Sequence, residues 1–226
     1  TRGNLKATIA LACQAILFDF DGVLVNSAAC VERLLTAWAI RHSLAPADVI
    51  HVAHGRRTVE TVRLVAPHLD AEAEASALTA AEAVTTDGIA EVPGAKTLVE
   101  SLARDRWAIV TSGARAVAKL RLEATGLPEP RVLICAEDVT RGKPDPEGYL
   151  AAAGRLGVAP YDCIIVEDAP AGLAAANAAR IRSVGVVGTY RVGALTDATY
   201  VVAALSSLRV VEGRRSDPLT VQLTPA

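Results

Sequence analysis

The sequence lacks the features that indicate a membrane, a nucleic acid or an oxidising environment. It has no run of basic residues and a formal net charge of only −2, so its charge balance suggests neither nucleic acid nor an anionic membrane surface as a partner. No apolar segment is long enough to span a bilayer. The four cysteines have no CxxC spacing and lie mostly among apolar residues, as reduced cysteines do. We therefore expect a cytoplasmic protein, and no protein partner can be inferred.

Short apolar strands alternate with helical segments along most of the chain. Apolar runs predict strands that begin at Ile16 and at 107, 132, 163 and 183. Helical spacing predicts helices near 95–104, 114–125, 146–157 and 171–180 between them. This alternation is typical of an α/β fold with a doubly wound parallel sheet. The chain has 226 residues, 51% of them apolar, which is enough for one core and a smaller second domain.

The stretch after the first strand has a different character. AACVERLLTAWAIRHSL has apolar residues at helical spacing, and DAEAEASALTAAEAV is rich in strong helix formers. No convincing strand occurs before Pro93-Gly94 ends the segment. We predict a small all-helical domain over 27–90, inserted into a core formed by 1–26 and 91–226.

Two carboxylates follow the first apolar run, in ILFDFDGVLV. A turn explains Asp21-Gly22, but it leaves Asp19 unexplained, because an ionised carboxylate at a strand end is costly unless a cation meets it. Residues two apart in an extended segment point to the same side, so we expect Asp19 and Asp21 to converge. Hard oxygen ligands of this kind suit Mg²⁺.

Other polar residues stand at the ends of later strands. Thr111 and Ser112 follow the second strand of the predicted sheet, and Glu167 and Asp168 end the strand that begins at 163. Lys143 lies in the proline-rich loop RGKPDP before a helix. Each of these features alone is more often a turn, a helix cap or a solvated side chain. Their occurrence together matters, because ligands bind at the carboxyl ends of strands in such folds.

With DFDGV, VTSG, the lysine of RGKPDP, and VEDAPAG in this order, the sequence resembles the haloacid dehalogenase superfamily of phosphatases. The resemblance covers nearly the whole chain, and the helical insertion is similar to that family's type-one cap. It implies a Rossmann-like core, Mg²⁺ as cofactor and a small phosphorylated metabolite as substrate. Val23 and Asn26 depart from the commonest form of the first motif, which weakens only the assignment to a subgroup.

The resemblance also implies a role for each of these residues. Asp19 is expected to attack phosphorus, and Asp21 to protonate the leaving alkoxide and then to activate water. Asp19, the backbone carbonyl of Asp21 and Asp168 are expected to bind Mg²⁺, with Glu167 as a nearby or water-mediated supporter. The remaining residues are expected to act on the phosphate: Thr111 through its hydroxyl, Ser112 through its N–H, and Lys143 through its charge.

The segment HGRRTVETVRLVAP, together with EVPGA, RWAIVTSG and RGKPDPEGYL, most resembles phosphatases of small sugars and glycerol phosphate, including the 2-deoxyglucose-6-phosphate type. Gly55 suggests a turn that presents His54 and Arg56 to the cleft as substrate-binding residues. For Arg57, a solvated arginine at a helix start is at least as well supported.

Related activities remain to be weighed. Asp21 argues against a dehalogenase, and the lack of lysine between Lys6 and Lys96 argues against phosphonate cleavage through a cap Schiff base. A sugar-phosphate mutase of the β-phosphoglucomutase type stays an alternative, because it uses the same core and cap. A phospho-accepting signalling receiver also combines acids, Thr or Ser and Lys, but it needs no helical lid.

Overall fold

The computed structural model describes residues 8–211 and 217–226, and its centre is a six-stranded sheet. The strand order is β6 (Val132–Ile134), β5 (Trp107–Val110), β2 (Ala15–Phe18), β7 (Cys163–Glu167), β8 (Arg182–Val186) and β9 (Tyr200–Val202). Every neighbouring pair is parallel. All five predicted strands belong to this sheet, so the prediction of a doubly wound α/β fold is confirmed.

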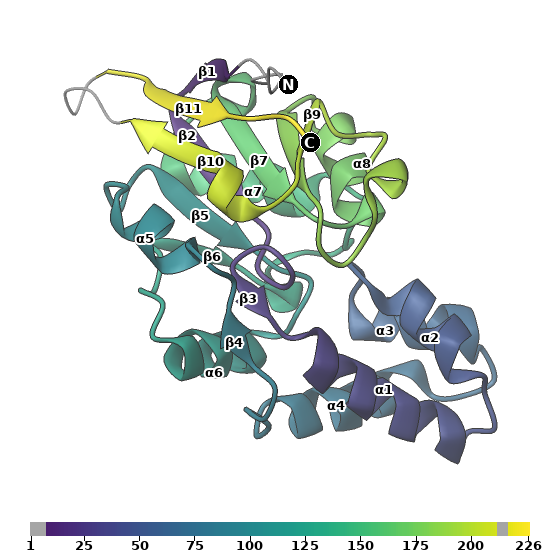
Figure 1. The fold of residues 1–226 in the computed structure, drawn as a ribbon. Helices are drawn as coiled ribbons and strands as arrows, with labels where there is room; N and C mark the ends of the chain where they lie inside the picture. Colours follow the sequence, from purple (N-terminus) through teal and green to yellow (C-terminus); the bar gives the residue numbers. More distant parts are fainter. Residues whose placement is uncertain (1–7, 212–216) are drawn as a thin grey trace, which may run out of the picture.

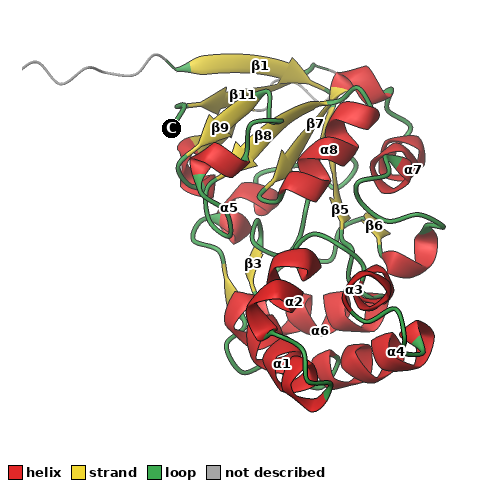
Figure 2. Cartoon of the chain, turned by 90° about the vertical axis from the view of Figure 1, so that its right-hand side faces the viewer, coloured by secondary structure: helices red, strands yellow, loops and turns green. Residues whose placement is uncertain are grey.

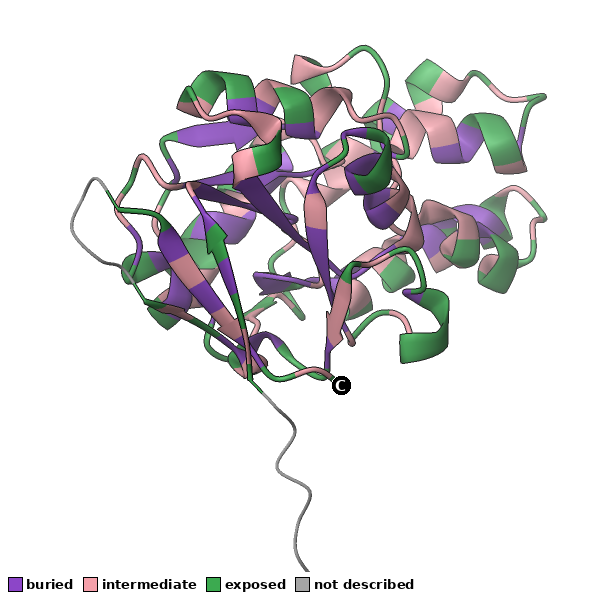
Figure 3. Ribbon diagram, turned by 90° about the horizontal axis from the view of Figure 1, so that it is seen from above, coloured by how far each residue is buried: buried purple, intermediate pink, exposed green. Residues whose placement is uncertain are grey.

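Helices cover both faces of the sheet because side chains along each strand alternate between two apolar clusters. In β2, Ile16 and Phe18 face the cluster that includes α5 (Ala95–Glu100) and α6 (Arg115–Thr125). Ala15 and Leu17 face the opposite cluster, with α7 (Glu147–Leu156) and α8 (Pro170–Ala178). Figure 2 shows α7 and α8 on one side of the sheet and α5 on the other, and Figure 3 shows the central strands as mostly buried.

Local sequence sets where these helices begin and end. Pro170 is the first residue of α8, a position where the missing N–H costs nothing. Gly126 and Gly157 end α6 and α7 with φ angles of 64° and 74°, which residues with a side chain rarely adopt. Short 3₁₀ helices occur at Ala136–Asp138, Pro160–Asp162, Val192–Ala194 and Leu205–Ser207. No helix within 8–211 and 217–226 is long and apolar enough to cross a membrane.

A second sheet was not predicted from the sequence. It is antiparallel, in the order β1 (Ile9–Cys13), β11 (Leu219–Leu223) and β10 (Leu208–Val211). It packs on the α5 side of the central sheet through buried residues such as Leu11 and Val221. Its strands come from both ends of the chain, so only tertiary pairing brings them together, although LTVQL alternates in burial as a half-buried strand does.

The first four helices after β2 form a separate layer, which we call the helical unit (residues 28–82). They are α1 (Ala28–Arg41), α2 (Pro46–Ala53), α3 (Thr58–Val65) and α4 (Ala71–Glu82), and they share their own apolar cluster around Trp38. Figure 1 shows the unit beyond one end of the central sheet.

The chain enters and leaves the helical unit through two paired segments. The strand β3 (Val25–Asn26) pairs antiparallel with β4 (Ala90–Glu91), which places the entry beside the exit. The domain division predicted at 26/27 and 90/91 stays a prediction, and residues 1–7 of the predicted core lie outside the described residues.

Candidate active site

Polar side chains meet at one edge of the sheet because parallel strands end there together. Asp19 follows β2, and its N–H donates to the carbonyl of Val166 in β7 at 2.9 Å. Thr111 follows β5, and its N–H donates to the carbonyl of Ile134 in β6 at 2.9 Å. Glu167 ends β7 and Asp168 comes next. The structure thus brings the predicted strand-end residues to one place, as the topology requires.

Lys143 joins this edge from the loop before α7 and is almost fully buried. Its ammonium donates to Oδ1 of Asp19 at 2.5 Å and to Oε1 of Glu167 at 2.8 Å. Burial disfavours the charged amine, but the carboxylates of Asp19 and Glu167 outweigh this and hold the pKa of Lys143 well above its ordinary value. Lys143 is therefore a fixed positive charge beside Asp19.

Glu167 serves chiefly to hold its neighbours in place. Besides Lys143, its Oε1 accepts from the Tyr149 hydroxyl at 3.4 Å, while Oε2 accepts the N–H groups of Asp168 at 2.6 Å and Ala169 at 2.9 Å. A side chain at Gly172 would strike Glu167, because its Cβ would lie 1.5 Å from Oε1. Both oxygens of Glu167 are thus engaged within the protein.

Three buried carboxylates face one ammonium, which leaves an excess of negative charge. Oxygens of Asp19, Glu167 and Asp168 lie within 4.8 Å of one another. Burial, followed by the charge on Glu167, raises the pKa of Asp19 to about 7, although Lys143 opposes the rise. Burial, followed by the charges on Glu167 and Asp19, raises the pKa of Asp168 well above its ordinary value. A small divalent cation bound by Asp19 and Asp168 would relieve this repulsion, so the donor set fits Mg²⁺.

The loop that follows Asp19 is tight and lies against Asp168. Gly22 has a φ of +86°, and its N–H donates to the Val25 carbonyl at 2.7 Å. A Cβ at Gly22 would lie only 1.9 Å from Oδ2 of Asp168. Glycine is required here both for the backbone angle and for the close approach of Asp168.

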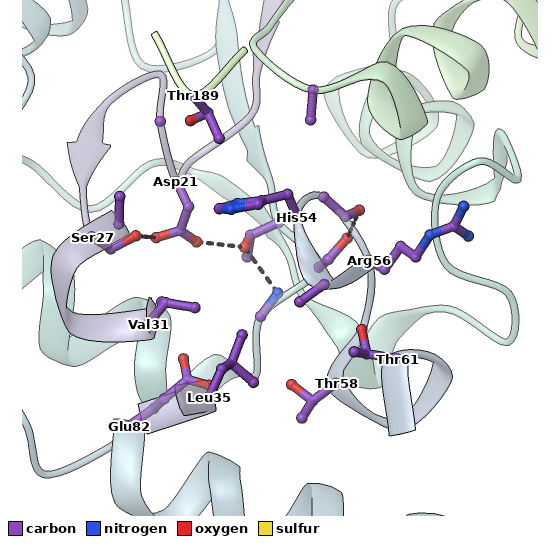
Figure 4. A pocket seen from close by; sticks show the side chains of 18 of the residues that line it. Asp21, Ser27, Val31, Leu35, His54, Arg56, Thr58, Thr61, Glu82 and Thr189 are labelled. Atoms are coloured by element: carbon purple, nitrogen blue, oxygen red, sulfur yellow. Dashed lines mark hydrogen bonds between the residues drawn. The ribbon is translucent and has the colours of Figure 1, made fainter. Parts of the chain in front are cut away.

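The expectation that Asp19 and Asp21 converge on one point stays a prediction: both residues line the same pocket, and their side chains bind different partners within the protein. Strand β2 ends at Phe18, so both aspartates lie beyond the regular strand. Oδ1 of Asp21 instead accepts from the Ser27 hydroxyl at 2.6 Å and from Arg121 at 2.6 Å. Oδ2 has a long contact of 3.5 Å with the Thr111 hydroxyl (Figure 4). Metal binding through the backbone carbonyl of Asp21 stays a prediction.

Thr111 and Ser112 lie between the two aspartates and the helical unit. Oγ1 of Thr111 accepts the N–H of Gly113 at 3.0 Å, which fixes the hydroxyl at the edge of the pocket. The hydroxyl of Ser112 donates to the Gly55 carbonyl at 2.9 Å, so it contacts the helical unit. The role of the Ser112 N–H toward phosphate stays a prediction.

A pocket of about 130 Å³ extends from Asp19 and Asp21 into the helical unit. His54 and Arg56 line it as expected (Figure 4). The ring of His54 packs edge-on against Tyr190 at 5.9 Å, and burial lowers the pKa of His54, which favours the neutral imidazole. The part lined by the helical unit is mixed in character, with apolar Val31, Leu35, Trp38, Val62 and Leu78 and polar Thr58, Thr61 and Glu82.

Sequence reasoning missed Arg121 and its partner Glu82. Arg121 is buried on α6 and donates to Asp21 and, at 2.8 Å, to Oε2 of Glu82 at the end of α4. Ser27 and Thr189, which lies beside Asp168, were also missed. An arginine on an amphipathic helix is ordinarily solvated, but this one meets Asp21 of the core and Glu82 of the helical unit. The sequence therefore carries no local sign of it.

Arg57 also differs from the solvated arginine that the sequence favoured. Its side chain is only 14% exposed. It donates to the backbone carbonyls of Val139 at 3.1 Å and Thr140 at 2.9 Å, which lie in the loop that leads to Lys143. The guanidinium thus joins the helical unit to the core.

Comparisons with known proteins place this arrangement among hydrolases. The model of the haloacid dehalogenase-like hydrolase family matches residues 13–180. Hexitol phosphatase A of Escherichia coli (strain K12) is 40% identical over 212 residues, covering 92% of this chain and 98% of that protein. The 2-deoxyglucose-6-phosphate phosphatase 1 of Saccharomyces cerevisiae is 32% identical over 224 residues, covering 88% and 91%.

Among solved structures, a hydrolase from Pseudomonas syringae superposes with a TM-score of 0.77 at 27% identity. The match covers 85% of this chain and 94% of that one. Because the superposition covers 85% of this chain, it includes residues of the helical unit as well as residues of the central sheet.

Proposed function

Because the chain belongs to the haloacid dehalogenase-like hydrolases, we propose that it is a Mg²⁺-dependent phosphatase that passes the phosphoryl group of a small sugar or polyol phosphate to Asp19 and then to water. One observation carries the proposal. The buried Asp19 carboxylate lies against a fixed ammonium at the edge of a pocket that the helical unit completes.

Asp19 is the nucleophile in this proposal. Lys143 binds its Oδ1, which leaves Oδ2 to attack phosphorus as the bond to the leaving oxygen breaks. The ammonium of Lys143 balances negative charge on the carboxylate and on the phosphate, since phosphoryl transfer depends mainly on positioning and electrostatics. The Thr111 hydroxyl, at the pocket edge, is placed to bind a phosphate oxygen.

Asp21 is the general acid and then the general base. Ser27 and Arg121 hold its Oδ1, so Oδ2 is the atom that gives a proton to the leaving alkoxide. The same oxygen then takes a proton from the water that attacks phosphorus, which frees Asp19 and releases phosphate. When bound by Asp19 and Asp168, Mg²⁺ supplies charge neutralisation that lets two anions approach each other.

The helical unit acts as a cap that selects the substrate. Its part of the pocket offers hydroxyl-binding groups at Thr58, Thr61 and Glu82 beside an apolar wall. The relatives named for hexitol and 2-deoxyglucose 6-phosphate support a hexitol or hexose phosphate as substrate. In this proposal, His54 and Arg56 contact the polar end of the substrate that lies away from Asp19. The four buried, free cysteines agree with a cytoplasmic location.

The test is a screen of phosphate release with Mg²⁺ across hexitol phosphates, 2-deoxyglucose 6-phosphate, glycerol phosphate and p-nitrophenyl phosphate. We expect sustained multiple turnover, which a signalling receiver does not give. The mutase alternative has less support from the relatives, and a hexose 1-phosphate tests it directly. Formation of hexose 6-phosphate faster than free phosphate, or no release from any of these esters, would show the proposal to be wrong.

A further inference from the structure

The loop that carries Lys143 is held by the helical unit through backbone contacts. Arg57, directly before α3, donates from Nη1 to the carbonyl of Val139 at 3.1 Å and from Nη2 to the carbonyl of Thr140 at 2.9 Å. These carbonyls lie three and four residues before Lys143. A side chain of the helical unit thus binds the segment that delivers the buried ammonium to Asp19.

Glu60 completes this contact from the first turn of α3. Its Oε1 accepts from Nε of Arg57 at 2.9 Å and from the N–H of Gly142, the residue directly before Lys143, at 3.1 Å. The two side chains are only 14% and 23% exposed, so water weakens the pair less than it weakens surface ion pairs. Arg57 and Glu60 therefore bind both carbonyl and N–H groups of one loop.

Gly142 is shaped for this contact. A Cβ there would lie 2.8 Å from Nε of Arg57 and 2.8 Å from Oε2 of Glu60, closer than real Cβ contacts occur. A side chain at this position would therefore have to displace Arg57 and Glu60 from the backbone of the loop. Beside it, the Ser112 hydroxyl binds the Gly55 carbonyl at 2.9 Å, which adds a second contact between core and helical unit.

We propose that Arg57 and Glu60 are positioning residues that couple closure of the helical unit to the placement of Lys143 between Asp19 and Glu167. The proposal rests on the proposed function, in which Lys143 supports the attack by Asp19. Without the contact the ammonium loses its fixed position whichever substrate is bound. Loss of Arg57 should therefore lower kcat for every phosphate ester, in contrast to Arg56, which faces the substrate.

The first experiment compares Arg57→Ala with Arg63→Ala, a matched control. Arg63 lies on α3, the helix that follows Arg57, and pairs with Glu72 at 2.5 Å, but that pair is exposed and lies wholly within the helical unit. Arg57→Ala should lower kcat roughly tenfold or more, equally for a sugar phosphate and for p-nitrophenyl phosphate, with little change in KM. Arg63→Ala should leave both constants unchanged. A loss confined to KM for the sugar phosphate would instead make Arg57 a substrate contact.

The second experiment separates this role from simple stabilisation of α3. The exchanged pair R57E/E60R keeps an ion pair three residues apart, but it offers the wrong groups to the loop carbonyls and N–H. It should stay as impaired as Arg57→Ala, and recovery of activity would overturn the proposal. Gly142→Ala should also lower kcat. Because both changes break one contact, the double variant R57A/G142A should be no worse than Arg57→Ala, whereas multiplied losses would contradict the coupling.

A third measurement does not depend on catalysis. The Gly142 amide, bonded to Glu60, should exchange its hydrogen slowly in the wild type and in Arg63→Ala, and faster in Arg57→Ala and Glu60→Ala. Fast exchange in the wild type would refute the contact itself. Protection without phosphatase activity would instead count against the proposed function and leave the contact intact. A cooperative thermal unfolding transition of Arg57→Ala, with a melting temperature well above the assay temperature, serves as the check that its fold is preserved.

Discussion

Arg121 lies between two carboxylates, and its removal provides a strong test of the pocket's electrostatics. It pairs with Oδ1 of Asp21 at 2.6 Å and with Oε2 of Glu82 at 2.8 Å. Its side chain is 4% exposed, against 15% for Glu82 and 30% for Asp21. Arg121→Met keeps most of the volume and removes the charge, so two carboxylates remain together without a cation.

The cost follows from the burial of the groups left behind. Breaking a buried ion pair by removing one partner costs about 3–5 kcal/mol. Asp21 is partly exposed, so we expect about 3 kcal/mol, the lower end of that range. For a chain of this size the melting temperature should fall by roughly 6–12 °C.

The loss should depend on pH in a defined direction. Burial raises the pKa of Glu82, and Arg121 limits the rise. Without Arg121 the folded protein holds the Glu82 proton to higher pH than the unfolded chain does, so stability is lost as pH rises. The difference in melting temperature between wild type and Arg121→Met should therefore be larger at pH 8 than at pH 5.5, as thermal unfolding at both values can show.

Two further variants make the result decisive. Lys119 lies on α6 with Arg121, and its exposed ion pair with Glu129 spans 3.9 Å. The substitution Lys119→Met should therefore change the free energy of unfolding by no more than about 0.5 kcal/mol. The double variant E82Q/R121M removes one of the unpaired charges and should regain part of the loss. The reasoning is refuted if Arg121→Met and Lys119→Met have the same melting temperature. It is also refuted if E82Q/R121M is less stable than Arg121→Met at pH 8.

Three other outcomes are expected. Burial, followed by the charge on Glu167, raises the pKa of Asp19 to about 7, so the metal-free protein should lose stability as pH rises toward 7. Mg²⁺ should therefore raise the melting temperature more at pH 8 than at pH 5.5. An equal rise at both pH values, or full activity of Asp168→Ala, would contradict the metal site. Arg56→Ala should raise KM for a sugar phosphate far more than for p-nitrophenyl phosphate, and equal losses would indicate damage to the fold. Burial raises the pKa of Cys135 and Cys163 to about 12, so these thiols should react with iodoacetamide at pH 8 only after unfolding, as mass spectrometry of digested protein can check.

Five strands of the central sheet were predictable because they are mostly buried and read as apolar runs, whereas β9, in which Tyr200 and Val201 are only partly buried, was not predicted. Polar residues at the ends of such runs could then be assigned to one edge, which indicated Asp19, Thr111 and Asp168, whereas Lys143 came from the loop RGKPDP and its resemblance to a family motif. The second sheet was not found, because β1 and β11 are far apart in the chain and pair only in the folded protein.

Side-chain direction beyond the strands was not predictable in the same way. Asp21 lies beyond the end of β2, and its partner Arg121 comes from α6, far away in the sequence. Arg57 and Arg121 look like surface residues of amphipathic helices. Their burial depends on how the helical unit packs against the core, which no local pattern describes.

The central claim is that Asp19 becomes covalently phosphorylated while Asp21 moves protons. In Asp21→Asn the side chain can neither protonate a leaving group nor activate water, but p-nitrophenolate leaves without help. Intact-mass measurement after mixing this variant with p-nitrophenyl phosphate and Mg²⁺ should show one added phosphoryl group, removable by hydroxylamine and absent in Asp19→Asn. An unmodified mass together with undiminished hydrolysis of glycerol phosphate would contradict the account.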